Sequence, residues 1–119
     1  MRRGEVRLVD FEPTRGVEAN KRRPAVVVSN DGANATAAGL GRGVVTVVPL
    51  TSNVTNVYPF QVLLLAGATG LGRDSKAQAE QVRSVAIERV GETAGLLPTD
   101  VMAALDDALD FTSHSDRAL

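Results

Sequence analysis

The sequence predicts a mainly β protein, a small antiparallel barrel or sandwich followed by one helix. Short Val-rich runs separated by Gly, Pro and Asn indicate several strands, and an apolar stripe at helical spacing follows them near the end of the chain. The 119 residues fit one domain, which we expect to span 1–119 with a polar tail over 110–119. Aromatic residues make up only 3% of the chain, so Val, Leu and Ala must form most of the core.

Three strands are predicted in the first half of the chain. Residues 4–11 form the first, and residues 24–30 are a β-branched run typical of a buried strand. Pro24 is tolerated at the start of this run because the hydrogen-bond ladder begins after it. Residues 44–50 form the third strand, and we expect Pro49 to end its pairing or to place it on a sheet edge.

The middle of the chain predicts loops and shorter strands. Residues 31–43 are small and polar and contain four glycines, which is typical of a loop. Residues 60–65 are expected to form a fourth strand, and residues 67–73 a glycine-rich turn without a helix. Residues 75–82 fit either a strand or a loop, and residues 84–89 have no clear type.

The clearest helix begins near Pro98, which suits a first turn, with Thr99 or Asp100 as its cap. Its apolar side chains recur at the i, i+3, i+4, i+7 and i+8 spacing of a core-facing stripe, at Val101, Met102, Leu105, Ala108 and Leu109. Beyond Asp110 the stripe ends and the sequence becomes polar.

The net charge alone disfavours a nucleic-acid partner, because 13 basic and 14 acidic residues sum to −1. These charges are unevenly distributed along the chain. Residues 1–23 carry seven basic and four acidic side chains, a net charge of +3, whereas residues 98–119 carry one basic and five acidic, a net charge of −4. In the net charge, the positive charge of the N-terminal segment is therefore cancelled by the negative charge of the C-terminal segment. Ordinary solvated faces would also produce this asymmetry.

Several functional classes are excluded by what the chain lacks. The absence of cysteine excludes a disulfide scaffold and a thiolate zinc site. The single histidine, His114, excludes a multi-histidine metal site, and we expect it to be inert. No run reaches the ~18 apolar residues of a membrane span, and the N-terminus has no apolar signal core. We therefore expect a cytoplasmic protein without a metal or another cofactor.

The polar loop over residues 12–23 is the first candidate for chemistry. It ends at Arg23, which opens the second strand, and a strand end holds a guanidinium in a fixed position. Arginine suits bidentate recognition of phosphate, and Glu18 can accept a proton if its pKa is tuned. The alternative, which the charges alone favour, is a solvated basic run from Lys21 to Arg23 paired with Glu18.

The turn after the third strand is the second candidate. Thr51, Ser52 and Asn53 follow that strand directly. Hydroxyl and amide groups at a strand end can bind phosphate oxygens or base edges. A plain turn is the alternative, since these residue types favour turns in any case.

A third polar cluster lies over residues 78–84. Alternation along a strand would place Gln81 and Arg83 on one face together with Ala79. Amides and guanidinium groups suit recognition of bases, although a solvated edge strand explains the cluster equally well. Asn30 is most simply a turn residue.

A nuclease built from this inventory has to work without a metal. RNA permits this, because its 2′-hydroxyl is its own nucleophile and the protein only has to align it, accept its proton and stabilise the phosphoryl charge. One arginine, one hydroxyl and one base suffice. DNA lacks that nucleophile and should resist.

Seven short phrases occur in order along residues 2–110, and together they resemble those of a known family. They are Arg3-Gly4-Glu5-Val6, Asp10-Phe11-Glu12-Pro13, Gly16-Val17-Glu18, Arg23-Pro24-Ala25-Val26-Val27, Pro49-Leu50-Thr51-Ser52, Tyr58-Pro59-Phe60-Gln61-Val62 and Gln81-Val82-Arg83-Ser84. The ordered set is similar to the MazF/PemK family of type II toxin–antitoxin toxins.

The resemblance implies a small SH3-like β-barrel with a C-terminal helix, working as a homodimer. It implies a metal-independent endoribonuclease that cuts single-stranded RNA, including mRNA, at short sequences and leaves a 2′,3′-cyclic phosphate and a 5′-hydroxyl. It also implies a MazE-like antitoxin whose acidic segment competes with RNA for the basic surface.

The resemblance also implies roles for individual residues. Arg23 matches the family's catalytic arginine, Thr51 its catalytic hydroxyl residue and Glu18 its loop glutamate, a candidate base. Six further residues fall where the family contacts RNA, namely Asn30, Ser52, Asn53, Gln78, Gln81 and Arg83. Some relatives carry an arginine and an aspartate near Gln78 and Glu80, so the correspondence there is loose.

Two departures from the family pattern leave alternatives open. Position 7 is usually aromatic but is Arg7 here; if buried, it would cost ~3 kcal/mol or more, and at the rim of the loop it would add RNA-facing charge. The end of the chain is polar after Asp110, where the family usually continues with leucines. A catalytically weakened toxin is one alternative, and a non-enzymatic gyrase inhibitor of the CcdB type, which shares the fold, is another.

Overall fold

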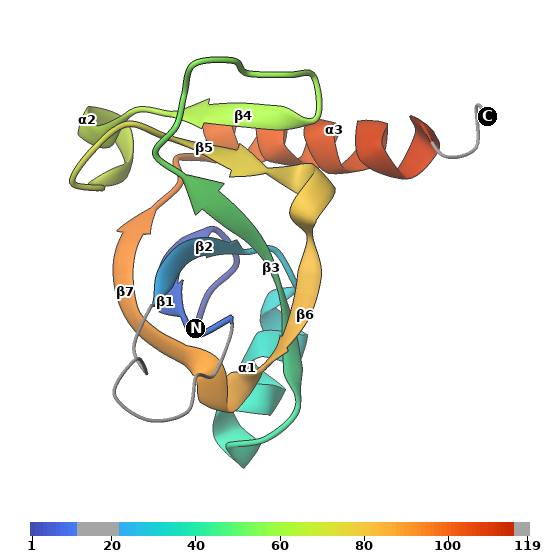
Figure 1. Ribbon diagram of the computed structural model, residues 1–119. Helices are drawn as coiled ribbons and strands as arrows, with labels where there is room; N and C mark the ends of the chain where they lie inside the picture. Colours follow the sequence, from blue (N-terminus) through green and yellow to red (C-terminus); the bar gives the residue numbers. More distant parts are fainter. Residues whose placement is uncertain (12–21, 116–119) are drawn as a thin grey trace.

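The computed structural model of the chain describes residues 1–11 and 22–115, with side chains described as far as Ser113. Most of the predicted loop over 12–23, including Glu18, lies outside the described residues, as does the end of the chain from 116. Figure 1 shows a strongly curved sheet with one long helix across its upper part and a second helix at its lower end.

Seven strands and three α-helices follow one another along the chain. The strands are β1 (Glu5–Val9), β2 (Arg23–Val27), β3 (Val44–Thr51), β4 (Gln61–Leu64), β5 (Ser75–Gln78), β6 (Arg83–Ala86) and β7 (Val90–Leu96). The helices are α1 (Asp31–Leu40), α2 (Ala66–Thr69) and α3 (Thr99–Ser115), with 3₁₀ turns η2 (Ala79–Gln81) and η3 (Ile87–Arg89). None of the described helices is long and apolar enough to span a membrane.

The strands form one antiparallel sheet in the order β4-β5-β3-β2-β1-β7, and β6 also pairs with β3. The two partners share the same edge of β3: β6 pairs with Val44–Val47 and β5 with Leu50 and Thr51. This confirms the predicted mainly β, antiparallel class with a C-terminal helix. The sheet is not closed into the expected barrel, because β4 and β7, the two end strands of this order, do not pair with each other in the described part of the chain.

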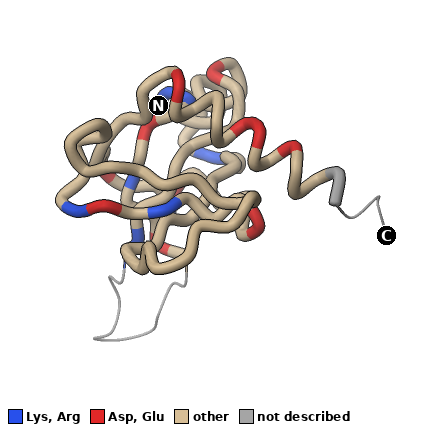
Figure 2. Tube along the Cα trace, turned by 90° about the horizontal axis from the view of Figure 1, so that it is seen from above, with Lys and Arg blue, Asp and Glu red and all other residues tan. Residues whose placement is uncertain are grey.

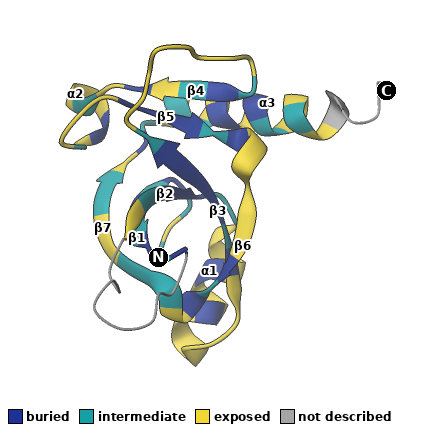
Figure 3. Cartoon of the chain, viewed as in Figure 1, coloured by how far each residue is buried: buried dark blue, intermediate teal, exposed yellow. Residues whose placement is uncertain are grey.

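Two apolar clusters lie on opposite faces of the central strands. Val26 and Val48 point to one face, where they pack with Leu105 of α3. Ala25 and Val47 point to the other, because successive side chains alternate along a strand. Figure 3 shows that β3 is buried along most of its length. The long β3 therefore holds both clusters together, as its predicted Val-rich run requires.

The predicted end of pairing at Pro49 holds for β2 alone, because the last pair of the β2–β3 ladder is Ala25 with Pro49 whereas β3 itself goes on to pair with β5. β3 continues to Thr51, and Ala25 of β2 lies opposite Pro49. On the other edge of β3, Val47 is the last residue that pairs with β6 and Leu50 is the first that pairs with β5. Pro49 lies in the gap between these two partners, where its missing N–H costs no ladder hydrogen bond.

The predicted loop over residues 31–43 is wrong, because α1 occupies Asp31–Leu40. Asn30 caps this helix: its side-chain oxygen accepts a hydrogen bond from the Ala33 N–H at 2.8 Å. Gly41 ends it in the left-handed conformation, with φ of 67°. The intervening alanines favour helix strongly, and this propensity outweighs the glycines that suggested a loop.

The second half of the chain corrects further expectations. The turn over 67–73 begins with the short helix α2. The segment 75–82 is a strand followed by a 3₁₀ turn, and this turn breaks the alternation that would have aligned Ala79, Gln81 and Arg83. The segment 84–89 divides between β6 and η3. The helix α3 continues through the polar stretch after Asp110 as far as Ser115.

The strand β7 has no counterpart among the predicted elements, and its glycines explain why. A side chain at Gly95 would place its Cβ 2.7 Å from the carbonyl oxygen of Thr69, and one at Gly91 would meet the Arg22 guanidinium and the Leu8 carbonyl. β7 therefore needs glycine where α2 and β1 approach it closely. The approach at Gly95 also brings Leu71 against β7.

Candidate active site

A cavity of about 480 Å³ opens at the end of the sheet where β2 begins and β3 ends. Its lining brings together three of the residues singled out in the sequence, Arg23, Thr51 and Ser52. The remaining walls come from β1, β2, β3, β5, β7 and the segment between α2 and β5, namely Leu8, Pro24, Leu50, Leu71, Gly72, Arg73, Ser75 and Ala94. One site is thus assembled from segments far apart in the sequence.

The β2–β3 ladder brings Arg23 and Thr51 to the same end of the sheet. Its last pair is Ala25 opposite Pro49, and Arg23 and Thr51 each lie two residues beyond it, where both line the cavity. Arg23 is exposed, and Thr51 is half-buried with its Oγ1 accepting a hydrogen bond from the Asn53 N–H at 3.2 Å. The threonine hydroxyl keeps its own proton available for a ligand in the cavity.

Arg73 is a second cation of the cavity, and it is not among the residues predicted from the sequence. It lies in the turn before β5, after glycines that do not match a phosphate loop. The turn is anchored by the next residue, because Asp74 accepts a hydrogen bond from the Ala66 N–H at 2.8 Å. In the sequence, the one feature that could have indicated this cation is the Arg-Asp pair that follows the glycines.

The charge of this cavity suits an anion. Arg23 and Arg73 line it together with the hydroxyls of Thr51, Ser52 and Ser75, and no carboxylate is among the lining residues that the structure describes. Guanidinium groups bind phosphate oxygens through paired hydrogen bonds. Figure 2 shows acidic positions along α3, which carries no lysine or arginine. The acidic helix nevertheless contacts the basic N-terminal segment, because Arg3 forms an ion pair with Asp106 of α3.

The remaining predicted RNA contacts lie outside the cavity lining. Asn53 is exposed in the loop after β3, one residue beyond Ser52. Gln78 is half-buried at the end of β5, and Gln81 is exposed in η2. Arg23 begins β2, whereas Asn30 lies past the other end of that strand, where its side chain caps α1. Glu18 is outside the described residues, so no position is assigned to it.

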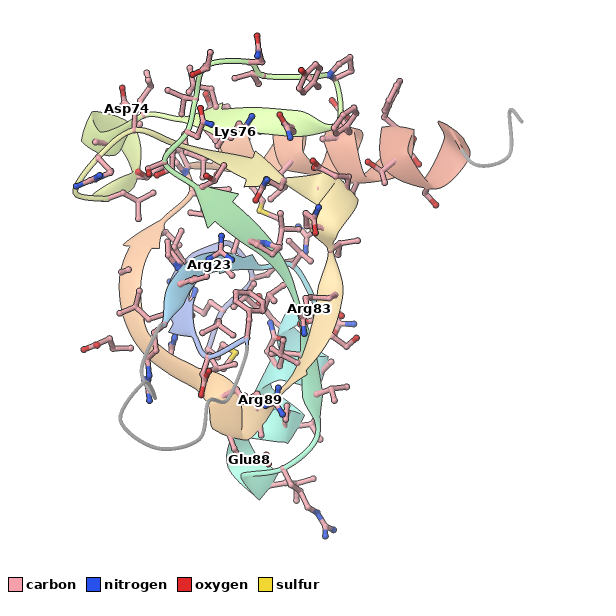
Figure 4. All side chains as sticks on the ribbon, in the orientation of Figure 1. Arg23, Asp74, Lys76, Arg83, Glu88 and Arg89 are labelled. Carbon is pink, nitrogen blue, oxygen red and sulfur yellow. The ribbon has the colours of Figure 1, made fainter. Side chains whose placement is uncertain are left out.

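Arg83 shares a face of the sheet with Arg23. It lies opposite Val47, and Val47 precedes Thr51 by four residues on β3, about 13 Å along the strand. Its guanidinium carbon is 5.0 Å from the ring centroid of Phe11, an arrangement that stacks the cation on the aromatic face. Figure 4 shows Arg23 on β2 and Arg83 on β6. The basic surface therefore extends beyond the cavity along this face.

Arg7 takes neither of the two positions considered for it. It is half-buried, its Nε donates to the Gly91 carbonyl at 2.7 Å, and its Nη1 donates to Glu5 at 3.2 Å. Burial by itself raises the pKa of Glu5, but hydrogen bonds from the Arg2 N–H and from Arg7 lower that pKa below its ordinary value. The charge of Arg7 is therefore paired inside the fold and does not line the cavity.

Comparison with known proteins decides the family. Residues 2–112 match the family of PemK-like, MazF-like toxins of type II toxin–antitoxin systems. The chain belongs to this family. The match covers nearly the whole chain and confirms the membership predicted from the seven ordered phrases.

Individual relatives of the MazF type agree with this assignment. The chain is 63% identical over 109 residues to the endoribonuclease MazF9 of Mycobacterium tuberculosis, covering 92% of both chains. The crystal structure of MazF from Deinococcus radiodurans is 29% identical, has a TM-score of 0.70, and aligns over 100% of this chain and 97% of its own. A MazE–MazF structure from the same organism is 27% identical with a TM-score of 0.71, covering 100% and 97%. These neighbours confirm the predicted fold class.

Proposed function

We propose that this MazF-type endoribonuclease toxin cuts single-stranded RNA at the cavity between Arg23 and Thr51, without a metal ion. The observation that carries the proposal is the lining of one cavity by two arginines and a threonine hydroxyl, with no carboxylate among the described lining residues. Such a lining complements a phosphodiester. The family membership and the 63% identical endoribonuclease support this activity over the gyrase-inhibitor alternative.

The proposed reaction uses the RNA's own nucleophile. The 2′-oxygen forms a bond to phosphorus while the bond from phosphorus to the 5′-oxygen breaks. The 2′-hydroxyl proton passes to a base, and the departing 5′-oxygen gains a proton, so the ends are a 2′,3′-cyclic phosphate and a 5′-hydroxyl. Glu18 stays our candidate for the base, although it lies outside the described residues.

The described residues supply charge stabilisation and alignment. The Arg23 and Arg73 guanidinium groups hold the non-bridging phosphoryl oxygens, on which negative charge grows in the transition state. The Thr51 hydroxyl donates to one of these oxygens and fixes the phosphate relative to β3. Ser52 contacts RNA at the cavity. Asn53, Gln78, Gln81 and Arg83 contact it beyond the cavity, and Asn30 does so only if RNA reaches the start of α1.

Two partners belong to the same proposal. We propose that the chain works as a homodimer and is inhibited by a MazE-like antitoxin, for which the MazE–MazF structure of the Deinococcus relative is the supporting observation. An acidic antitoxin segment would be attracted to Arg23, Arg73 and Arg83 and would exclude RNA from them. The cytoplasmic location likewise stays a prediction.

The test is cleavage of a mixed-sequence single-stranded RNA by purified protein in EDTA. The proposal requires cutting by the wild-type protein and its loss in Arg23→Ala. A folded wild-type protein that leaves the RNA intact, but arrests DNA supercoiling by gyrase, would instead support the inhibitor alternative.

A further inference from the structure

Lys76 on β5 is a nearly buried lysine, with only 8% of its surface exposed. Its Nζ donates a hydrogen bond to the Asn56 carbonyl at 2.5 Å and lies 5.8 Å from the ring centroid of Tyr58. No carboxylate pairs with it among the residues that the structure describes. A buried ammonium without a counter-ion is costly, so the carbonyl and the aromatic ring are what compensate it.

Lys76 lies in the same cross-strand row as the cavity residues. It is opposite Thr51 of β3 on one side and opposite Leu63 of β4 on the other. Thr51 and Lys76 therefore share one face of the sheet, and Thr51 lines the cavity together with Arg23. Figure 4 shows Lys76 beneath the loop that connects β3 to β4.

That loop, residues 52–60, directly continues the strand that carries Thr51. From Ser52 to Pro59 it is exposed throughout. Its own hydrogen bonds are local: the Asn53 N–H donates to Thr51, and the Thr55 N–H donates to the Asn53 side chain, both at 3.2 Å. Among the described hydrogen bonds of residues 52–57, the bond from Lys76 is the one that comes from another strand.

The aromatic part of the loop is held at the same point. The rings of Tyr58 and Phe60 stack with their centroids 5.4 Å apart and their planes 8° from parallel. Lys76 contacts Tyr58 and bonds Asn56, so it joins the tip of the loop to its aromatic base. The loop is thereby fixed against β5 rather than only at its two ends.

We infer that Lys76 is a positioning residue that fixes the 52–60 loop beside Thr51 and thereby sets which RNA bases the site accepts. This rests on the proposed endoribonuclease function. Ser52 and Asn53, at the start of the loop, offer the hydroxyl and amide groups that read base edges, and a loop held in one conformation discriminates between bases better than a loop that can adapt. Lys76 acts through the loop and touches neither the scissile phosphate nor the reacting atoms.

The chain provides a direct reporter of loop position. Tyr58 is the single tyrosine of a chain without tryptophan, so tyrosine fluorescence comes from the loop itself. The experiment compares the full-length protein with Lys76→Met, which keeps the length of the side chain but removes the ammonium. Arg42→Met, at an exposed position between α1 and β3, is the matched control for the lost charge. Acrylamide quenching of Tyr58 and sequencing of the ends of cleaved RNA are measured on the same preparations.

Lys76→Met should increase the acrylamide quenching of Tyr58 and broaden the set of cut sequences. The ratio of kcat/KM between preferred and single-mismatch RNA should fall about ten-fold, a smaller effect than the ~10²-fold that a misplacement of 1 Å can cause. The control should change neither quantity, and Lys76→Arg should restore part of the discrimination because it keeps a donor and a charge. If Lys76→Met does not fold, Tyr58→Leu, at an exposed ring, should produce the same broadening.

The outcomes separate this inference from the function on which it rests. A variant that folds, cuts the same sequences and shows unchanged Tyr58 quenching overturns the role of Lys76 and leaves the ribonuclease function intact. A lower melting temperature with an unchanged cut-site pattern also overturns it, because a merely structural lysine would behave in that way. A wild-type protein that cuts no RNA overturns both, and the quenching measurement then still reports the loop contact.

Discussion

Arg23 at the start of β2 and Thr51 at the end of β3 line one cavity of about 480 Å³. Each lies two residues beyond the last pair of the β2–β3 ladder, which joins Ala25 to Pro49. A cation and a hydroxyl are therefore held on the rigid part of the sheet, whereas Arg73 approaches from a turn. Each of these groups can be removed separately by mutation.

Arg23→Ala should lower kcat/KM for single-stranded RNA by about 10²–10³-fold, which is the usual effect of removing one donor that stabilises a transition-state oxyanion. Folding should be preserved because the side chain is exposed. Initial cleavage rates in EDTA measure the effect, and Arg42→Ala, which removes an equally exposed charge away from the cavity, should keep wild-type rates. An Arg23→Ala protein with full activity would remove Arg23 from the mechanism.

Arg73→Ala should weaken RNA binding and reduce its dependence on salt. Each phosphate contact on single-stranded nucleic acid contributes about 0.7 to the slope of log K against log salt concentration, so the slope should become shallower by about that amount. Binding of an uncleavable 2′-deoxy analogue, measured at several salt concentrations, provides the slope. An unchanged slope would mean that Arg73 lines the cavity without contacting phosphate.

Leu105→Ala should destabilise the fold by about 2–5 kcal/mol, as large-to-small changes at buried leucines do. Leu105 lies on the core-facing side of α3, is fully buried and packs against Val26 and Val48. Chemical denaturation measures the free energy of unfolding. The exposed Asp107→Ala on the same helix should stay within about 0.5 kcal/mol of wild type, and a similar loss in both variants would contradict the packing of α3 on this cluster.

The pair between Glu5 and Arg7 should stabilise the protein only above acidic pH. The folded pKa of Glu5 lies below its ordinary value, so its contribution is present above the unfolded pKa and is lost as pH falls through the folded pKa. Arg7→Met removes one of the groups that lower this pKa. The melting temperatures of wild type and variant should therefore differ more at pH 7 than in acid, where the Glu5 carboxyl is protonated in both the folded and the unfolded chain and only the lost hydrogen bond to Gly91 still separates the two proteins. A constant difference across that range would assign the effect to packing alone.

The sequence was most informative where burial dominates. The Val-rich runs predicted β2 and β3, and the apolar stripe predicted α3, because a core-facing pattern has few alternatives. It was least informative where the signal of one residue competes with the overall composition of the segment around it. Asn30 is a good helix cap, yet the glycines after it suggested a loop, and the strand β7 was hidden by Gly91 and Gly95, which are present because other backbone segments approach them closely.

The site shows the same division. Arg23 and Thr51 could be singled out because each lies at the end of a strong strand, and the resemblance then gave them roles. Arg73 and Lys76 could not be found in this way. Their importance depends on the pairing of β5 with β3, a long-range contact that no local pattern in the sequence encodes. Gln78, Gln81 and Arg83 were correctly predicted to be a polar group. The 3₁₀ turn η2 lies between Gln78 and Arg83, so the three side chains do not follow the alternation of one continuous strand.

The most direct test of the central claim is the chemistry of the ends of RNA cut in EDTA, determined by mass spectrometry together with a substrate that carries a single 2′-deoxy nucleotide at the cut position. We expect a 2′,3′-cyclic phosphate and a 5′-hydroxyl, and no cutting at the deoxy position. A 5′-phosphate end, or cutting at the deoxy position, would contradict attack by the RNA's own 2′-hydroxyl at the cavity of Arg23 and Thr51.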